Sequence, residues 1–137
     1  MSLVVDSSIT LTWVMIDEPS NTADAVFDRI KESGAVAPSL WRLEVANALQ
    51  MAVRRKRIDT AFRDVSIADL LTLPITIDTE TAHHAWAATL QLAERHNLTL
   101  YDAAYLELAQ RRGLPLATLD RELGAAGSAL GISVLGY

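Results

Sequence analysis

Short apolar runs rich in β-branched residues alternate along the chain with longer segments whose apolar residues recur every three or four positions. Runs of the first kind predict buried strands, at residues 3–5, 35–37, 74–77, 116–118 and 132–135. Segments of the second kind predict helices, at residues 9–16, 19–32, 38–56, 60–71, 79–96, 100–112 and 121–130. Strands that alternate with helices in this way are typical of a parallel sheet covered by helices on both faces.

The ends of several predicted helices carry the residue types that such ends favour. Thr79 and Thr99 offer a hydroxyl in the position of an N-cap, and Gly34 and Gly113 follow expected helix ends. The second helix is expected to start at Pro19 and Ser20 and to run to about Glu32. No repeat and no long linker divides the chain, so residues 1–137 are expected to form one α/β domain.

Composition narrows the possible chemistry. The chain has 137 residues, half of them hydrophobic, and no cysteine. It therefore has no disulfide, no thiolate metal site and no cysteine nucleophile. No apolar run approaches the roughly 20 residues that span a bilayer, and the first residues lack the apolar core of a signal peptide. We expect a cytoplasmic protein with no membrane segment.

The net charge of −5 argues against a nucleic-acid-binding protein. The objection weakens if several acids gather in one site and a divalent metal neutralises them. Basic residues do cluster, at residues 54–57 and at Arg111 and Arg112. The simpler interpretation of both clusters is a solvated helix end that the helix dipole favours.

Asp102 is the acid with the most informative position. On a helical wheel for residues 100–112, Tyr105 and Leu108 belong to an apolar arc, and Asp102 falls near its centre. Glu107 lies on the far, polar side. An ionised carboxylate inside an apolar arc is costly unless it is paired, hydrogen-bonded or bound to a metal. The alternative is an acid of the first helical turn that stays partly solvated and is favoured by the helix dipole.

Three further acids have related positions. Glu44 lies at the edge of the apolar stripe of the third predicted helix, where a surface glutamate is also common. Asp6 and Asp120 directly follow predicted strands and precede helices. An aspartate at that junction is a favoured N-cap. However, open parallel sheets also gather their sites at the carboxyl ends of strands.

Taken together, Asp6, Glu44, Asp102 and Asp120 are expected to converge on one small space. Carboxylates that lie close together repel one another and raise each other's pKa values. A hard cation with oxygen ligands relieves this repulsion, so Mg²⁺ or Mn²⁺ fits better than zinc. The three histidines lack the spacing of a zinc site and are expected to be structural or exposed.

Four segments around these acids resemble the motifs of the PIN-domain family, in the order and spacing of VapC-type toxins from toxin–antitoxin pairs. They are LVVDSS at residues 3–8, LEVANAL at 43–49, LYDAAY at 100–105 and ATLDREL at 117–123. The resemblance spans nearly the whole chain. It implies a three-layer α/β/α fold around a parallel sheet and a ribonuclease activity that depends on Mg²⁺ or Mn²⁺. It also implies a homodimer and a cognate antitoxin as partner.

By the same resemblance, the four acids are the expected catalytic and metal-binding residues. Three of them, Asp6, Asp102 and Asp120, would bind the cation directly or through water. Glu44 would complete the shell or orient the nucleophile. Ser8 and Thr118 would help to hold a water molecule or a carboxylate, although helix or turn capping explains their hydroxyls equally well. All four acids are present, so an inactive member of the family is not favoured.

Other classes of function remain as alternatives. Haloacid-dehalogenase and receiver-type phosphoryl-transfer domains also place an aspartate after the first strand. The first needs a second aspartate where this chain has Ser8, and the receiver needs a late lysine, whereas the last lysine here is Lys56. A non-catalytic module of the same fold is a further alternative, with Trp13, Trp41 and Trp86 as anchors for a partner. Cleavage of DNA is not excluded either, because no residue visibly reads a 2′-hydroxyl.

Overall fold

The computed structural model describes residues 2–15 and 20–136. Five parallel strands form one sheet in the order β3–β2–β1–β4–β5. They are β1 (Val4–Val5), β2 (Ala35–Ala37), β3 (Ile75–Ile77), β4 (Leu116–Ala117) and β5 (Val134–Leu135). All five were predicted; the last is shorter than the expected 132–135.

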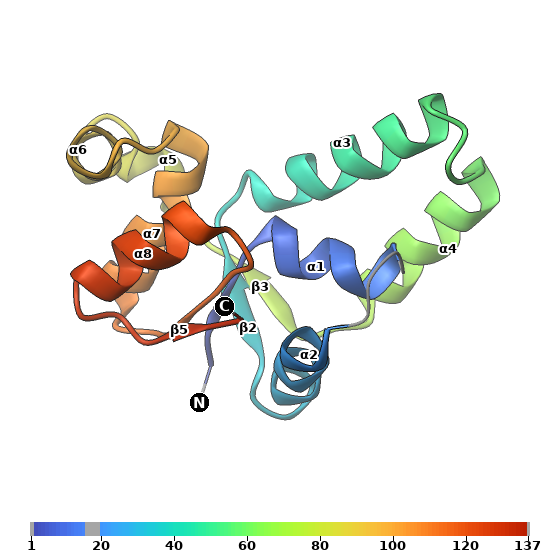
Figure 1. Ribbon diagram of the computed structural model, residues 1–137, viewed down its shortest axis with the longest axis horizontal. Coiled ribbons are helices and arrows are strands. Elements are labelled where there is room, and N and C mark those ends of the chain that lie inside the picture. The colour runs from blue at the N-terminus through green and yellow to red at the C-terminus, as the bar shows by residue number, and fades with distance from the viewer. Residues whose placement is uncertain (1, 16–19, 137) are drawn as a thin grey trace.

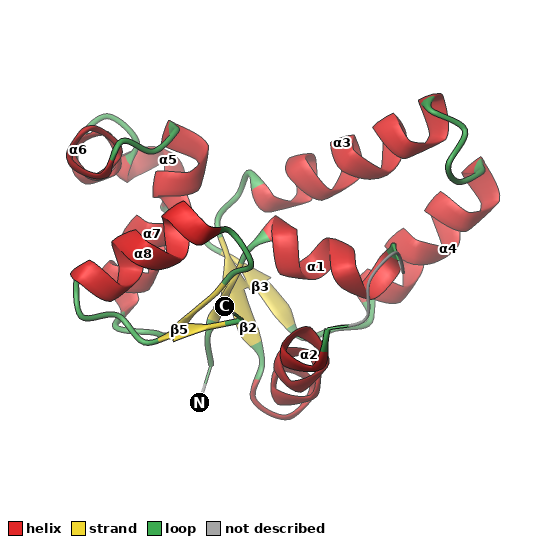
Figure 2. Ribbon diagram, in the orientation of Figure 1, coloured by secondary structure: helices red, strands yellow, loops and turns green. Residues whose placement is uncertain are grey.

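Helices cover both faces of this sheet (Figures 1 and 2). The first group is α1 (Ser7–Val14), α2 (Asn21–Ser33), α3 (Trp41–Arg54) and α4 (Thr60–Leu71). The second group is α5 (Thr81–His84), α6 (Ala88–His96), α7 (Leu100–Arg112) and α8 (Arg121–Ala129). Figure 1 shows α1–α4 on one side of the strands and α6–α8 on the other. The predicted three-layer α/β/α architecture is confirmed.

The order of the strands decides where a site forms. Central β1 pairs with β2 on one side and with β4 on the other, with Val4 opposite both Val36 and Leu116. The chain leaves β1 into α1 on one face and leaves β4 into α8 on the opposite face. Parallel sheets open a crevice where neighbouring strands part in this way. The corresponding position here is at the carboxyl ends of β1 and β4.

Side-chain caps start five of the helices. In each case an oxygen of the capping side chain accepts a backbone N–H of the first turn, which would otherwise have no partner. The capping residues are Asp6, Ser20, Asp59, Thr99 and Asp120. The prediction for Thr99 is confirmed. The first helix ends at Val14, two residues before the expected end at Ile16. The predicted start of the second helix at Pro19 lies outside the described residues.

The single helix predicted over residues 79–96 is wrong. Two helices, α5 and α6, occupy this stretch, and the backbone turns sharply at Ala87 between them. Thr79 caps neither helix. Instead, Thr81 donates its hydroxyl to Oδ2 of Asp78 at 2.9 Å and accepts the N–H of Ser39 at 3.0 Å. These bonds fix α5 at the edge of the sheet, whereas α6 packs against α7.

The expectation that Glu107 lies on a polar face of α7 is also wrong, although Gln110 is exposed as expected. All seven residues from Ala103 to Ala109 are buried, and Glu107 is only 4% exposed. The reason is that α7 packs against α6, α8 and the sheet at once, so no face of its middle turns reaches water. Burial of Glu107 is made possible by Arg111, whose Nε donates to Oε2 of Glu107 at 2.8 Å. Arg111 is therefore no solvated helix end, whereas residues 54–57 are exposed as expected.

Arg111 also pairs with Asp78, which follows β3 and is itself buried. The guanidinium donates to both carboxylate oxygens of Asp78, at 2.8 and 3.3 Å. We call Asp78, Glu107 and Arg111 the ion-paired cluster.

No helix within the described ranges is long and apolar enough to cross a membrane.

Candidate active site

Asp6 stands at the centre of the candidate site, directly after β1. Its side chain is buried, with 3% of the residue exposed. Oδ1 accepts the Ser8 hydroxyl at 2.7 Å and the Ile9 N–H at 3.1 Å. Oδ2 accepts the hydroxyl of Thr118, which follows β4. The capping prediction for Asp6 is confirmed, and the same carboxylate also ties the end of β1 to the end of β4.

Asp120 is held close to Asp6 by the same two hydroxyls. The Asp120 N–H donates to Oγ1 of Thr118 at 2.9 Å, and the Leu119 N–H donates to Oγ of Ser8 at 3.0 Å. Oδ1 of Asp120 accepts the Leu123 N–H at 2.9 Å and so caps α8. Ser8 and Thr118 therefore join the two strand ends, and the capping prediction for Asp120 is confirmed.

Glu44 approaches this pair from α3. The hydroxyl of Tyr105, on α7, donates to Oε1 of Glu44 at 2.5 Å, and the hydroxyl of Ser7 donates to the same oxygen at 3.4 Å. Burial, followed by the bond to Glu44, raises the pKa of Tyr105 far above its ordinary value. Tyr105 therefore keeps its proton and acts as a donor. Sequence analysis placed Tyr105 in the apolar arc and did not detect this contact.

Asp102 completes the group from the first turn of α7. It is partly buried, and its N–H donates to the Thr99 hydroxyl at 3.1 Å. Its position matches the alternative prediction, an acid of the first turn that stays partly solvated. Burial raises the pKa of Asp102, and the charges of Asp120 and Glu44 raise it further. Asp102 thus interacts electrostatically with acids from two other parts of the chain.

The pKa of Asp6 is raised even more clearly, to about 6. Burial is the main cause, and the charge of Asp120 adds to it. Hydrogen bonds from Thr118, Ser8 and Ile9 oppose the shift without cancelling it. Ionisation of such a carboxylate costs free energy in the folded protein when no cation is bound.

The charge of Asp120 acts on both Asp6 and Asp102, and the charge of Glu44 acts on Asp102. These interactions link Asp6, Glu44, Asp102 and Asp120, and we call these four residues the acidic site. Within the described parts of the chain, no lysine, arginine or histidine forms an ion pair with any of them. Glu122, in the first turn of α8, also raises the pKa of Asp102. Its place two residues after Asp120 is the signal that sequence analysis overlooked.

The donor chemistry of the acidic site fits Mg²⁺ or Mn²⁺. The donors are carboxylate and hydroxyl oxygens, and a cation would relieve the repulsion that raises the two pKa values. Among the described side chains, no three of the types His, Cys, Asp and Glu lie close enough to form a ready-made metal cluster. Mg²⁺ characteristically keeps several water ligands and uses only one or two carboxylates. The arrangement suits an ion held partly through water.

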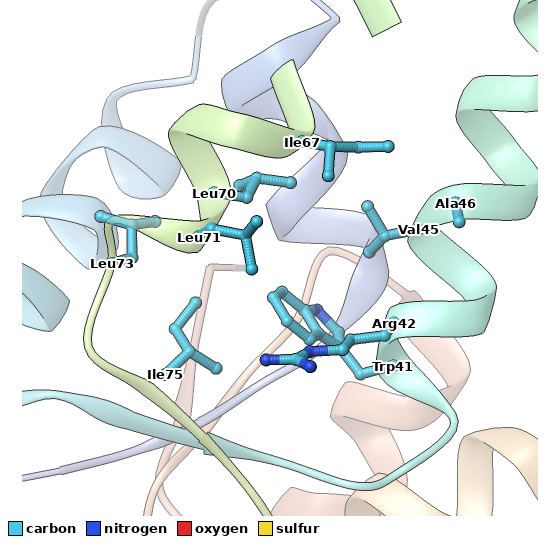
Figure 3. A pocket seen from close by; sticks show the side chains of 9 residues that line it. All are labelled: Trp41, Arg42, Val45, Ala46, Ile67, Leu70, Leu71, Leu73 and Ile75. Carbon is cyan, nitrogen blue, oxygen red and sulfur yellow. The ribbon is translucent and has the colours of Figure 1, made fainter. Parts of the chain in front are cut away.

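The apolar pocket between α3, α4 and β3 is a separate feature. It encloses about 260 Å³, and Figure 3 shows the side chains around it: Trp41, Arg42, Val45, Ala46, Ile67, Leu70, Leu71, Leu73 and Ile75. Arg42 is the only charged residue in that lining. The pocket contains no carboxylate and none of the four acids, so it offers no group for acid–base or metal chemistry.

The histidines lie outside the acidic site. His83 and His84 contact each other edge to face in α5, with ring centroids 5.1 Å apart, and His83 is exposed. His96 ends α6. No group of described residues that includes a histidine forms a metal site.

Comparison with known proteins agrees with this fold. The PIN-domain family profile matches residues 3–128. Ribonuclease VapC1 of Mycobacterium tuberculosis is 38% identical over 97 residues, which cover 71% of each chain. Ribonuclease VapC3 of Pyrobaculum aerophilum is 32% identical over 127 residues, 90% of this chain and 92% of the relative.

Solved structures show the same architecture. PAE2754 from Pyrobaculum aerophilum superposes with a TM-score of 0.70 and 26% identity, over 98% of this chain and 83% of the other. The Mycobacterium tuberculosis toxin VapC20, described as cleaving the sarcin–ricin loop, shares the fold at a TM-score of 0.64 and 16% identity. That match covers 91% of this chain and 95% of VapC20.

An α/β/α domain around a parallel sheet is the fold that the family resemblance implied. This chain belongs to the PIN-domain family and, through its curated relatives, to the VapC group within it. The resemblance stated from the four sequence motifs is thereby confirmed.

Proposed function

We propose that this chain is a metal-dependent endoribonuclease, the toxin of a toxin–antitoxin pair, which hydrolyses phosphodiester bonds in RNA. One observation carries the proposal: the charges of Asp120 and Glu44 act on carboxylates near the ends of β1 and β4, and no described lysine, arginine or histidine forms an ion pair with any of the four acids. The names of the curated relatives, which are ribonucleases of the VapC group, support RNA as the substrate.

The hydrogen bonds of the four acids support a separate role for each of them in the proposed reaction. Asp6 holds the two strand ends together with both of its oxygens, and Asp120 uses one oxygen to cap α8. Asp6, Asp102 and Asp120 would hold Mg²⁺ or Mn²⁺ directly or through water. Glu44 would complete the set or orient the attacking water. When bound, the cation supplies charge neutralisation at the phosphate and a more acidic water molecule.

We further propose the partners that the family resemblance implies. A cognate antitoxin would silence the enzyme, and two copies of the chain would form a homodimer. A ribonuclease that must be silenced acts where cellular RNA is, so we place it in the cytoplasm. Light scattering of the free chain tests the homodimer, and co-expression with a VapB-type antitoxin, followed by light scattering of the complex, tests the second association.

A non-catalytic protein-binding module is the second candidate, and Trp86 favours it. This indole is 91% exposed, whereas Trp41 is buried and donates to Thr10 at 3.0 Å. Trp13 likewise donates to the carbonyl of Ala23, at 2.9 Å. Only Trp86 among the three is therefore free to anchor a partner. Metal binding without cleavage of any RNA would support this candidate.

The test uses the purified chain, free of antitoxin, with total cellular RNA. We expect discrete fragments with Mg²⁺ or Mn²⁺ and none with chelator. Asp6→Asn, which keeps the shape of the side chain and removes its charge, serves as the inactive control. Cleavage that persists in chelator would refute the metal-dependent scheme. Sequencing of the fragment ends would identify the RNA.

A further inference from the structure

Tyr105 combines deep burial with a polar contact that points toward the acidic site. The residue is 1% exposed and lies in the core beside β1. A phenylalanine would fill the same apolar space, so the ring alone does not require a tyrosine. A buried phenolic hydroxyl needs a hydrogen-bond partner. In this chain the partner is Glu44, one of the four acids, at 2.5 Å.

The two carboxylate oxygens of Glu44 differ in their hydrogen bonds. Oε1 accepts the Tyr105 hydroxyl at 2.5 Å and the Ser7 hydroxyl at 3.4 Å. No described donor forms a hydrogen bond to Oε2. One oxygen is therefore anchored to the protein, and the other is left for water or a cation. In Asp6, by contrast, both oxygens are occupied by donors of the chain.

Anchoring matters because glutamate is flexible. Its side chain has three rotatable bonds, and Glu44 is only partly buried in α3. A free carboxylate would spread over several rotamers and would give up that freedom each time it bound a ligand. Groups that support a metal-binding side chain remove this cost, and their loss typically weakens metal affinity 10- to 100-fold.

The anchor also connects two elements of the site. Glu44 belongs to α3, on one face of the sheet, and Tyr105 belongs to α7, on the other face, three residues after Asp102. The single bond between them therefore sets the position of Glu44 relative to the helix that carries Asp102.

We propose that Tyr105 is a positioning residue, whose hydroxyl holds Oε1 of Glu44 so that Oε2 faces the ligand in the acidic site. The inference rests on the proposed function, because it assigns a purpose to Glu44 within that site. It adds a residue that lies outside the four acids and does not itself touch metal or RNA.

The first experiment measures Mn²⁺ affinity by electron paramagnetic resonance on antitoxin-free protein. Tyr105→Phe removes only the hydroxyl, and we expect it to weaken Mn²⁺ binding about tenfold. Tyr101→Phe, which makes the same change at an exposed tyrosine of the same helix, is the matched control and should leave affinity unchanged. In a Glu44→Gln background, Tyr105→Phe should add less than a twofold further loss, because the group that it positions has already been altered.

The second measurement needs no activity, and its first part uses only the wild-type chain. In crystals of the wild-type chain soaked in Mn²⁺, the anomalous peak should lie nearer Oε2 of Glu44, with Oε1 still on Tyr105. A crystal structure of metal-free Tyr105→Phe should show Glu44 in more than one rotamer.

Two results would overturn the inference. One is a Tyr105→Phe protein that keeps wild-type Mn²⁺ affinity and a single Glu44 rotamer. The other is Mn²⁺ bound to Oε1 with the Tyr105 contact broken. Failure of the proposed function looks different, because the wild-type chain itself would then neither bind Mn²⁺ nor cleave RNA, and the inference would fall with it.

Discussion

The acidic site and the ion-paired cluster both bury carboxylates, but they differ in what surrounds the charge. In the ion-paired cluster, Arg111 reaches Asp78 and Glu107 with hydrogen bonds as short as 2.8 Å. In the acidic site, neutral hydroxyl and N–H groups donate to the carboxylates, and no described side chain brings a positive charge.

The pKa values of the two buried aspartates, Asp78 and Asp6, shift in opposite directions because of this difference. Burial alone would raise the pKa of Asp78, but hydrogen bonds from Arg111 and Thr81, together with the charge of Arg111, hold it below its ordinary value. Burial, together with the charge of Asp120, raises the pKa of Asp6 to about 6. The chain thus pairs its buried acids where they are structural. Where buried acids have no positively charged partner, as in the acidic site, carboxylates with raised pKa values indicate a functional site.

The largest effect should come from Asp102→Asn in the acidic site. The substitution removes a charge at a position that would hold the cation, so we expect cleavage of RNA to fall about 10³-fold, or about 4 kcal/mol in activation free energy. The metal-free fold should be as stable as the wild type or slightly more so, because repulsion from Asp120 and Glu44 is relieved. Initial rates and urea unfolding of the same preparation measure both quantities.

Asp78→Asn is the control from the ion-paired cluster, since it makes the same chemical change at an aspartate that is buried and paired with Arg111. It should lose stability and retain activity while folded. If Asp102→Asn were instead the strongly destabilised variant, Asp102 would belong to the structural class of buried acids.

The contrast between the two clusters also explains what sequence patterns predict well. Leu3, Val4 and Val5 are completely buried because β1 is the central strand, and a central strand must be apolar on both faces. The end of β1 is equally easy to predict from the sequence, because Asp6, the first polar residue after it, can only lie at the carboxyl edge of the sheet. The alternation of strands and helices therefore gave the architecture and the positions of two site residues.

Partners of side chains are harder to predict because they depend on packing between distant elements. The helical wheel of α7 assumed one buried face, but α6 covers the opposite face, so Glu107 is buried as well. The bond between Tyr105 and Glu44 joins residues 61 positions apart. Nor does any glycine or proline mark the break at Ala87, where the anchoring of α5 by Thr81 overrides the local helical pattern.

The next largest effect should come from Arg111→Met, which breaks the ion-paired cluster and leaves Asp78 and Glu107 buried without a counter-charge. Removal of one partner from a buried ion pair typically costs 3–5 kcal/mol. Because 19% of the Arg111 side chain is exposed, we expect about 3 kcal/mol in the free energy of unfolding. Arg112→Met, at the exposed neighbouring position, should change it by less than about 0.5 kcal/mol. Equal effects of the two variants in urea titrations would show that the cluster contributes nothing.

The smallest expected effect is on the pH dependence of stability, which should differ between Asp6 in the acidic site and Asp78 in the ion-paired cluster. The folded state keeps the proton of Asp6 up to about pH 6, whereas the unfolded chain releases it near pH 3.8. The folded state therefore binds more protons in this window, and the free energy of unfolding should fall as the pH rises from about 4 to 6. The difference of roughly two pKa units sets an upper limit of about 3 kcal/mol. Asp78 acts in the opposite direction and at lower pH, because its stabilisation is lost only as the pH falls below its ordinary pKa.

Urea unfolding in chelator at several pH values tests this expectation, with Asp6→Asn as the comparison. The variant should lack most of the decline between pH 4 and 6 and should be more stable than the wild type at pH 7. Its amide oxygen still accepts hydrogen bonds, and the Thr118 hydroxyl can rotate to accept one from the amide nitrogen. Saturating Mg²⁺ should stabilise the wild type at pH 7 and leave the variant nearly unchanged, because only the charged site requires the cation. An identical pH dependence in both proteins would mean that burial of Asp6 carries no electrostatic cost, and the contrast with the ion-paired cluster would then lose its physical basis.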